Sequence, residues 1–177
     1  MRGRGPSMIE VQVLGVLVDE ESRSPLVLLR AVEGEETLPI RLGFPEAGAI
    51  AAVLEEVDLP RPLTHDLLMN LLDALEGKVV KAELTDLRDE TFYSILYVRR
   101  GRKTFRFEAR PADSIALCLR AQAPLYVSEE VFRKAAPRDV AEASRHQWLA
   151  FLHSLEAAAD PSAIGRDDPS PDDKTVQ

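Results

Sequence analysis

The strongest constraint on the fold is the order in which strand-like and helix-like segments follow one another. Three segments rich in aliphatic and β-branched residues come first, at 9–18, 26–31 and 37–42. Two amphipathic stretches follow, and then three more strand-like segments at 78–87, 91–100 and 103–108. Strands that occur in blocks, instead of alternating strictly with helices, are typical of α+β proteins. The order therefore predicts a mixed or antiparallel sheet from two strand blocks, with helix pairs packed on it.

The two helices between the strand blocks each begin at a start signal. Pro45 has the fixed φ that suits a first helical turn, and apolar residues recur after it at Ala49, Ile50, Val53, Leu54 and Val57. A second helix is predicted from an N-cap at Thr64 to Glu76, with Gly77 as the residue after its end. Its apolar face comprises Leu67, Leu68, Leu71, Leu72 and Leu75.

The C-terminal third of the chain contains three further predicted elements. Pro111 opens a helix that runs to Arg120, and a short strand follows at 125–127. Ser128 is placed to cap a short helical turn, and a longer C-terminal helix is predicted over 139–158. The predicted organisation is a flexible N-terminus, a folded domain, a helical appendage and a disordered acidic tail, at 1–8, 9–135, 136–160 and 161–177.

Composition places the chain among cytoplasmic globular proteins. Apolar residues make up 45% of the 177 residues, charged residues make up 29%, and the formal net charge is −8. The single Cys118 lies in an apolar run, which predicts a buried, inert thiol and excludes a disulfide framework. No apolar run reaches the length of about 18 residues that a membrane span needs, so no membrane partner is expected.

Polar residues gather at three predicted helix starts. Glu46 stands at the first, Arg61, Thr64, His65 and Asp66 at the second, and Arg110 and Asp113 at the third. Each residue has a structural explanation as a helix cap, a dipole partner or a member of a local ion pair. Together, carboxylates, arginines and one imidazole at three junctions indicate a shared polar cleft.

A separate cluster of positive charge surrounds the predicted turn at Gly101. It consists of Arg99, Arg100, Arg102, Lys103 and Arg106. Such a hairpin tip is able to contact phosphates, in which case affinity would depend on salt. The alternative is an edge hairpin on which the charges prevent edge-to-edge pairing with other chains.

Four sequence runs resemble the bifunctional nuclease family of bacterial and plant proteins. They are LPIRLGFPEAGAIAAVLE, PRPLTHDLL, TFYSILYV and ARPADSIALCLRAQAPLYVSEEV, and the similarity covers about residues 9–135. The resemblance implies an α+β domain, often dimeric, with nuclease activity on RNA and DNA. The chain has Arg41 where the family usually has Trp, and Glu108 where it usually has Asp.

The helix starts and the resemblance together lead to a specific hypothesis, a phosphodiesterase acting on RNA or DNA with Mg²⁺ or Mn²⁺. The catalytic candidates are Glu46, His65, Asp66 and Asp113, and the metal ligands would be Glu46, Asp66 and Asp113. The substrate-binding candidates are Arg61, Thr64, Arg100, Arg102, Lys103, Arg110 and Arg120. The alternatives are a non-catalytic regulatory module that binds an anion or a protein at the same cleft, and a structural dimer that assembles through its final helix.

Overall fold

The computed structural model describes residues 7–19, 22–34 and 36–135, which form one seven-stranded sheet with helices packed on it. The α+β prediction is therefore confirmed. The strands are β1 (Met8–Val18), β2 (Pro25–Ala31), β3 (Thr37–Arg41), β4 (Gly77–Arg88), β5 (Thr91–Arg100), β6 (Lys103–Ala109) and β7 (Leu125–Ser128). The predicted C-terminal helix and acidic tail, and most of the predicted flexible N-terminus, lie outside the described residues. Within them, no helix is long and apolar enough to cross a membrane.

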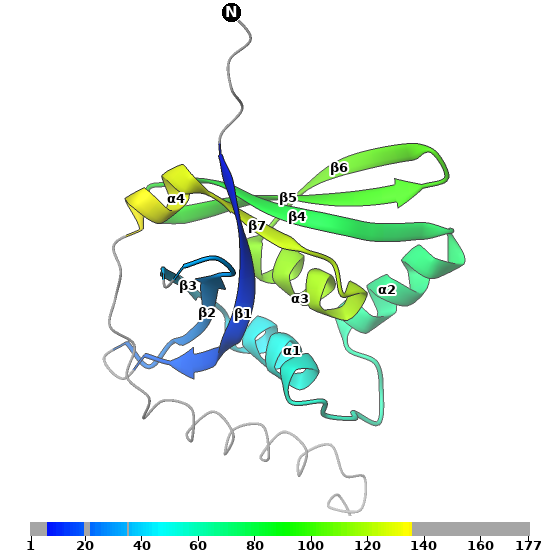
Figure 1. Cartoon of the computed structure of the whole chain (residues 1–177). Helices are drawn as coiled ribbons and strands as arrows, with labels where there is room; N and C mark the ends of the chain where they lie inside the picture. Colours follow the sequence, from blue (N-terminus) through cyan, green and yellow to red (C-terminus); the bar gives the residue numbers. More distant parts are fainter. Residues whose placement is uncertain (1–6, 20–21, 35, 136–177) are drawn as a thin grey trace, which may run out of the picture.

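The sheet consists of the two predicted strand blocks joined by β7, in the order β3-β2-β1-β7-β4-β5-β6. Each block is an antiparallel meander. Leu125 of β7 pairs antiparallel with Val11 of β1 and parallel with Ala82 of β4, so this four-residue strand connects the blocks. Its position makes one continuous sheet, which curves around the helices (Figure 1).

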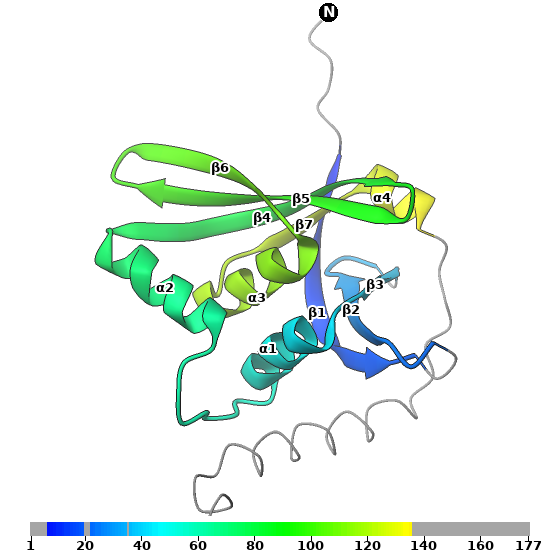
Figure 2. The same ribbon diagram turned by 180° about the vertical axis from the view of Figure 1, so that it is seen from behind.

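Three helices lie within the curve of the sheet, on one of its faces: α1 (Phe44–Leu54), α2 (Thr64–Ala74) and α3 (Pro111–Ala121) (Figures 1 and 2). The short helix α4 (Glu129–Lys134) packs against β4 and β7, away from α2. The predicted cap of α4 is confirmed, since Ser128 Oγ accepts a hydrogen bond from the backbone N–H of Glu130 at 3.3 Å.

Helix α3 is the centre of the hydrophobic core. Its residues Ile115, Ala116, Leu117 and Cys118 are all buried, and the cluster that they join includes residues of both strand blocks and of α1. Burial raises the pKa of the Cys118 thiol to about 12. A thiol with such a pKa is protonated at neutral pH, and the prediction that Cys118 is buried is confirmed.

Both ends of α2 lie earlier in the chain than predicted, since the helix spans Thr64–Ala74. The N-cap is Leu63, and Thr64 is the first helical residue. Leu63 has no side-chain acceptor, and Asp66 instead accepts a hydrogen bond from the Leu63 backbone N–H at 2.7 Å. At the other end, Glu76 has the left-handed φ of 57° that was expected at Gly77, and Gly77 begins β4.

The leucine-rich face of α2 does not pack into the core, as the prediction of a helix pair packed on the sheet implied it would. Leu67, Leu68, Leu71 and Leu75 are exposed, whereas Leu72 packs against the core with Met69. The reason is the position of α2 at the margin of the domain, where it contacts α3 on one side and the start of β4 on another. The remaining side of the helix therefore has no covering element among the described residues.

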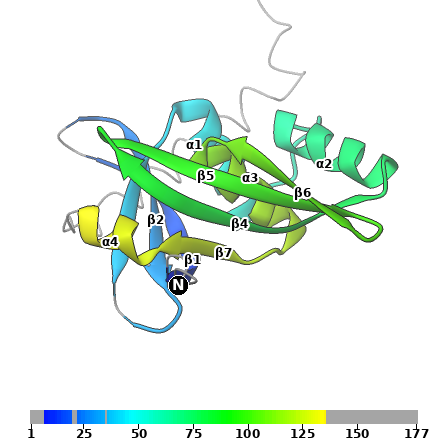
Figure 3. The same cartoon turned by 90° about the horizontal axis from the view of Figure 1, so that it is seen from above.

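Strand β6 forms the opposite margin of the sheet from β3 and is the edge strand beside β5. Residues 103–108 are all exposed. Figure 3 shows the β5–β6 hairpin extending beyond the body of the domain, on the same side as α2.

Candidate functional site

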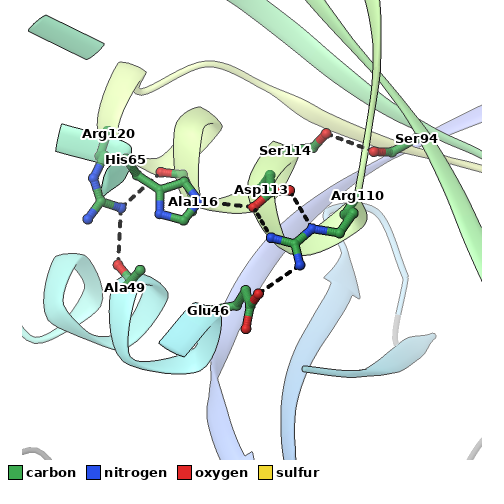
Figure 4. Close-up of polar contacts among 9 residues, drawn as sticks. All are labelled: Glu46, Ala49, His65, Ser94, Arg110, Asp113, Ser114, Ala116 and Arg120. Carbon is green, nitrogen blue, oxygen red and sulfur yellow. Dashed lines mark hydrogen bonds and ion pairs between the residues drawn. The ribbon is translucent and has the colours of Figure 1, made fainter. Parts of the chain in front are cut away.

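The three predicted polar helix starts converge in the structure, because the N-terminus of α3 lies between the first turns of α1 and α2. Four side chains meet there and are called the polar cluster: Glu46, His65, Arg110 and Asp113 (Figure 4). Glu46 comes from α1, His65 from α2, and Arg110 and Asp113 from the start of α3. The three predicted junctions are therefore in contact through these four residues, and a cleft at this place stays a prediction.

Arg110 holds the two carboxylates of the polar cluster. Its Nε and Nη2 atoms donate to the two oxygens of Asp113 at 2.8 and 3.0 Å, and its Nη1 atom lies 2.8 Å from Glu46 Oε1. The hydrogen bond and charge of Asp113, followed by those of Glu46, raise the pKa of Arg110 further. The Arg110 side chain is 68% exposed, so a ligand in solvent can reach the guanidinium.

His65 contacts the other side of the Asp113 carboxylate. The distance between His65 Nε2 and Asp113 Oδ1 is 3.2 Å, and the imidazole is mostly buried. Burial of Asp113 opposes its ionisation, but the hydrogen bonds from Arg110 and His65 outweigh burial and lower its pKa. Asp113 is therefore an anion at neutral pH, held between an arginine and an imidazole.

Two buried serines support the start of α3 beneath the polar cluster. Ser94 of β5 and Ser114 of α3 share a hydrogen bond of 2.7 Å, and Ser94 Oγ donates to the backbone oxygen of Ala109 at 2.7 Å. These hydrogen bonds join β5, the end of β6 and α3. They therefore fix the position of the first turn of α3, from which Arg110 and Asp113 extend.

The remaining acid of the predicted site, Asp66, takes part in a different ion pair. Arg120 Nε donates to Asp66 Oδ1 at 2.6 Å, and Arg120 Nη1 donates to the backbone oxygens of Ala49 and Ala116 at 3.0 and 3.1 Å. The Arg120 side chain is only 8% exposed. Burial opposes ionisation of Asp66, but the bonds from Arg120 and the Leu63 N–H lower its pKa. This pair connects all three helices and has the geometry of a structural contact.

The predicted metal ligands do not converge on one point. Glu46 and Asp113 both face Arg110, whereas Asp66 faces Arg120. Across residues 7–19, 22–34 and 36–135, no three His, Cys, Asp or Glu side chains are grouped as a metal ion would require. The carboxylates thus fit arginine binding better than a three-ligand cation site.

The other predicted substrate-binding residues form none of the contacts of the polar cluster. Arg61 is exposed in the loop between α1 and α2, and Thr64 is exposed at the first position of α2. Arg100 and Lys103 pair across the β5–β6 hairpin, with Arg102 in its turn, at the opposite end of β6 from Arg110. The structure therefore separates a polar cluster from a basic hairpin tip.

Sequence reasoning missed two aromatic residues between these regions. Phe105 and Phe107 on β6 are 44% and 50% exposed, and their ring centroids lie 6.4 Å apart with 25° between the ring planes. The signal is present in residues 103–108, where Phe105 and Phe107 alternate with polar residues. From sequence alone this alternation does not reveal two exposed rings, because a strand with one buried face has the same pattern.

A match to a known protein family shows the family of this chain. Residues 27–139 match the family described as the bifunctional nuclease domain. The chain belongs to this family. The family resemblance inferred from the four sequence runs is therefore confirmed, and all four polar-cluster residues lie within the matched region.

The relatives of the bifunctional nuclease domain fall into two groups. Proteins from two strains of Mycobacterium tuberculosis, both named as uncharacterized, are each 42% identical over 128 residues, which is 72% of this chain and 76% of theirs. A protein named bifunctional nuclease 1 from Oryza sativa is 21% identical over 109 residues, which is 59% of this chain and 33% of the rice protein. The name that refers to nuclease activity thus belongs to the more distant relatives.

Proposed function

We propose that this bifunctional nuclease domain hydrolyses phosphodiester bonds in RNA or DNA at the polar cluster. The observation that carries the proposal is the His65–Asp113–Arg110 arrangement, in which an imidazole and an exposed guanidinium flank one ionised carboxylate. Membership of the family adds the expectation of nuclease chemistry. The imidazole supplies a group for proton transfer, and the guanidinium supplies positive charge for a phosphate.

Asp113 has a positioning role in this proposal. Its Oδ1 atom accepts a hydrogen bond from the tautomer of His65 that has its proton on Nε2, which leaves Nδ1 with a lone pair. Among the described residues, Nδ1 has no hydrogen-bond partner. His65 is then the general base that accepts a proton from the attacking water, and Asp113 stabilises the resulting imidazolium.

Arg110 is the phosphate-binding group. A guanidinium has five N–H donors, and three of them are used by Asp113 and Glu46. The two remaining donors are free to bind the non-bridging oxygens of a phosphodiester, whose negative charge increases as water attacks phosphorus. The bond from phosphorus to the leaving oxygen breaks as the bond from water forms, and the leaving oxygen takes a proton from solvent.

The test is cleavage of labelled RNA and DNA by the purified full chain and by His65→Gln and Asp113→Asn. Removal of the base or of its positioning group is expected to lower kcat by about 100-fold or more. Asp73→Asn is the matched control, because Asp73 is an exposed carboxylate of the same helix as His65. All variants are prepared in the same nuclease-deficient host, so a contaminating nuclease would give equal rates in every sample.

The metal requirement is tested in the same assay. The predicted dependence on Mg²⁺ or Mn²⁺ requires that cleavage stop with a chelator and return with either ion. Cleavage that continues in the chelator would leave the polar cluster as the sole source of catalysis. If neither ion nor chelator gives cleavage, and the variants equal the wild type, the nuclease proposal is wrong.

The second candidate is a non-catalytic module that binds an anionic ligand or a protein at the polar cluster. It is favoured by the pairing of every predicted catalytic carboxylate with an arginine or an imidazole. In that case Arg110→Gln abolishes ligand binding, while no preparation cleaves nucleic acid. The predicted dimer and cytoplasmic location also stay predictions; sedimentation of the full chain tests the first and cell fractionation tests the second.

A further inference from the structure

The β5–β6 hairpin presents a row of chemically matched side chains on one face of the sheet. Ser94 defines this face, because it contacts Ser114 of α3. Alternate residues of a strand share a face, and cross-strand partners lie on the same side. The register pairs Leu96 with Phe107, Val98 with Phe105 and Arg100 with Lys103, so all six residues are on the α3 face.

This row leads from the basic tip to the polar cluster. Lys103 begins β6, Phe105 and Phe107 follow on the same face, and Ala109 ends the strand immediately before Arg110. At about 3.4 Å per residue, the six steps from Lys103 to Ala109 span roughly 20 Å. The row is therefore long enough to hold several units of a linear polymer whose next unit reaches the polar cluster.

The two aromatic rings of the row are accessible and aligned. Their centroids are 6.4 Å apart, the planes differ by 25°, and about half of each side chain is exposed. Contiguous exposed apolar groups of this kind mark interaction sites on protein surfaces. Nucleobases are flat π-systems that stack on such rings irrespective of sequence.

The charge of the hairpin identifies the kind of polymer. Five basic side chains lie within residues 99–106, although the whole chain has a net charge of −8. Among the described residues, none of Arg99, Arg100, Arg102 and Lys103 forms an ion pair with a carboxylate. A phosphate backbone complements this charge, whereas the hairpin of a second copy would repel it.

We infer that the α3 face of the β5–β6 hairpin binds single-stranded nucleic acid, with bases stacked on Phe105 and Phe107 and phosphates on Arg100 and Lys103. The inference rests on the proposed function in one respect, that the bound strand is the substrate of the polar cluster. The preference for single strands follows from the rings, because bases in a duplex are paired and stacked on one another and cannot stack on protein side chains without being unpaired.

The test is binding of the full chain to a fluorescein-labelled oligothymidylate or oligouridylate of about 16 nucleotides, measured by anisotropy in a chelator. The Phe105→Leu/Phe107→Leu double variant keeps apolar side chains but removes both rings. It is expected to bind at least tenfold more weakly, the equivalent of about 1.4 kcal/mol. Phe105→Trp, with its larger ring, is expected to bind at least as tightly as the wild type. A duplex of the same length is expected to bind more weakly than either single strand.

Two substitutions that each remove one positive charge test whether oligonucleotide binding depends on the face of the hairpin that carries the charge. Lys103→Gln removes a cation from the α3 face, and Arg99→Gln removes one from the opposite face, which Arg99 shares with Tyr97. If Lys103 contacts a phosphate, its loss reduces the slope of log K against log salt by about 0.7. Arg99→Gln is expected to leave that slope nearly as it is. Equal effects of both substitutions on the slope would show only a general electrostatic attraction between the hairpin and the oligonucleotide, and would overturn the inference.

The outcomes separate this inference from the nuclease proposal. If Phe105 and Phe107 variants bind normally, the inference is wrong even if cleavage occurs. If binding depends on the rings but no preparation cleaves, the nuclease proposal fails and the binding surface remains. If the ring variants change the sedimentation coefficient and not oligonucleotide affinity, a second copy covers the face and the inference is overturned. Leu67→Ala/Leu71→Ala on α2 is the apolar control and is expected to keep oligonucleotide affinity within twofold.

Discussion

The two ends of α3 each have an arginine that binds an aspartate, yet the two pairs differ in almost every physical respect. At the C-terminal end, Arg120 is 8% exposed and uses backbone oxygens of α1 and α3 in addition to Asp66. At the N-terminal end, Arg110 is 68% exposed and binds Asp113 together with Glu46. Burial makes the first pair a contact between helices, and exposure leaves the second available to a ligand.

An Arg–Asp pair at a helix terminus therefore has no fixed role. Both pairs involve α3, and in both the aspartate has a lowered pKa. What differs is the third partner: His65 adds a titratable group at the exposed end, whereas Ala49 and Ala116 add carbonyl oxygens at the buried end. The four predictions below test whether activity belongs to one end and stability to the other.

The largest effect is expected from the two aspartates compared in one experiment. Asp113→Asn removes the anion that orients His65, so kcat is expected to fall by about 100-fold or more. Asp66→Asn leaves Arg120 without its counter-charge and is expected to lower the free energy of unfolding more than Asp113→Asn does. Nuclease assays and urea denaturation of both variants measure the contrast. A loss of activity greater for Asp66→Asn would reverse the assignment of the two ends.

The next effect concerns the stability of the buried end. Arg120→Met removes the guanidinium but retains an unbranched side chain, so Asp66 Oδ1 and the backbone oxygens of Ala49 and Ala116 lose the hydrogen bonds that Arg120 donates. The free energy of unfolding is expected to fall by about 2–3 kcal/mol, less than for a fully buried pair because Asp66 is partly exposed. Urea denaturation measures it. Unchanged stability together with lost cleavage would place Arg120 in the active site.

A smaller change in stability is expected for the same substitution at the exposed end. Arg110→Met breaks contacts with Asp113 and Glu46, but exposed ion pairs contribute at most about 1 kcal/mol. Substrate affinity is expected to fall, since the two free donors of Arg110 are lost. The pair of methionine variants is the matched comparison, and a greater loss of stability for Arg110→Met would show that exposure does not distinguish the ends.

The smallest effect is the dependence of stability on acid. The pKa values of Asp66 and Asp113 are both lowered in the folded state, so each contributes stability that is fully present above the ordinary value of about 3.9. That contribution is lost as pH falls below about 3.9 towards the lowered folded value. Denaturation midpoints between about pH 5 and about pH 3 measure the slope. Either Asn variant is expected to flatten it, and an unaltered slope in both would exclude these groups as its source.

Most of the secondary structure was predictable because it depends on local signals. The strand blocks follow from β-branched alternation, α3 begins at the predicted Pro111, and Ser128 caps α4 as expected. The errors at α2 have a local cause as well. Asp66 caps the helix through the Leu63 N–H, so Thr64 becomes helical, and Glu76 takes the left-handed φ in place of Gly77.

The exposed leucines of α2 could not be predicted from their periodicity. The same spacing occurs in helices buried by a core and in helices at the margin of a domain. In this chain α3 occupies the centre of the sheet and contacts both α1 and α2, so α2 presents one narrow side, with Met69 and Leu72, to the core. The order of the strands, and not the helix itself, decides which side is covered.

The fold class, the family and the set of polar helix starts are all readable from the sequence, because residue periodicity and short motifs are encoded in short stretches of chain. How the polar residues pair depends on the folded domain. Asp66 lies close in sequence to Arg61 but binds Arg120, 54 residues away, and His65 meets Asp113 across 48 residues. Such pairing depends on β7 joining the two strand blocks and on the packing of three helices, and no local pattern contains that information.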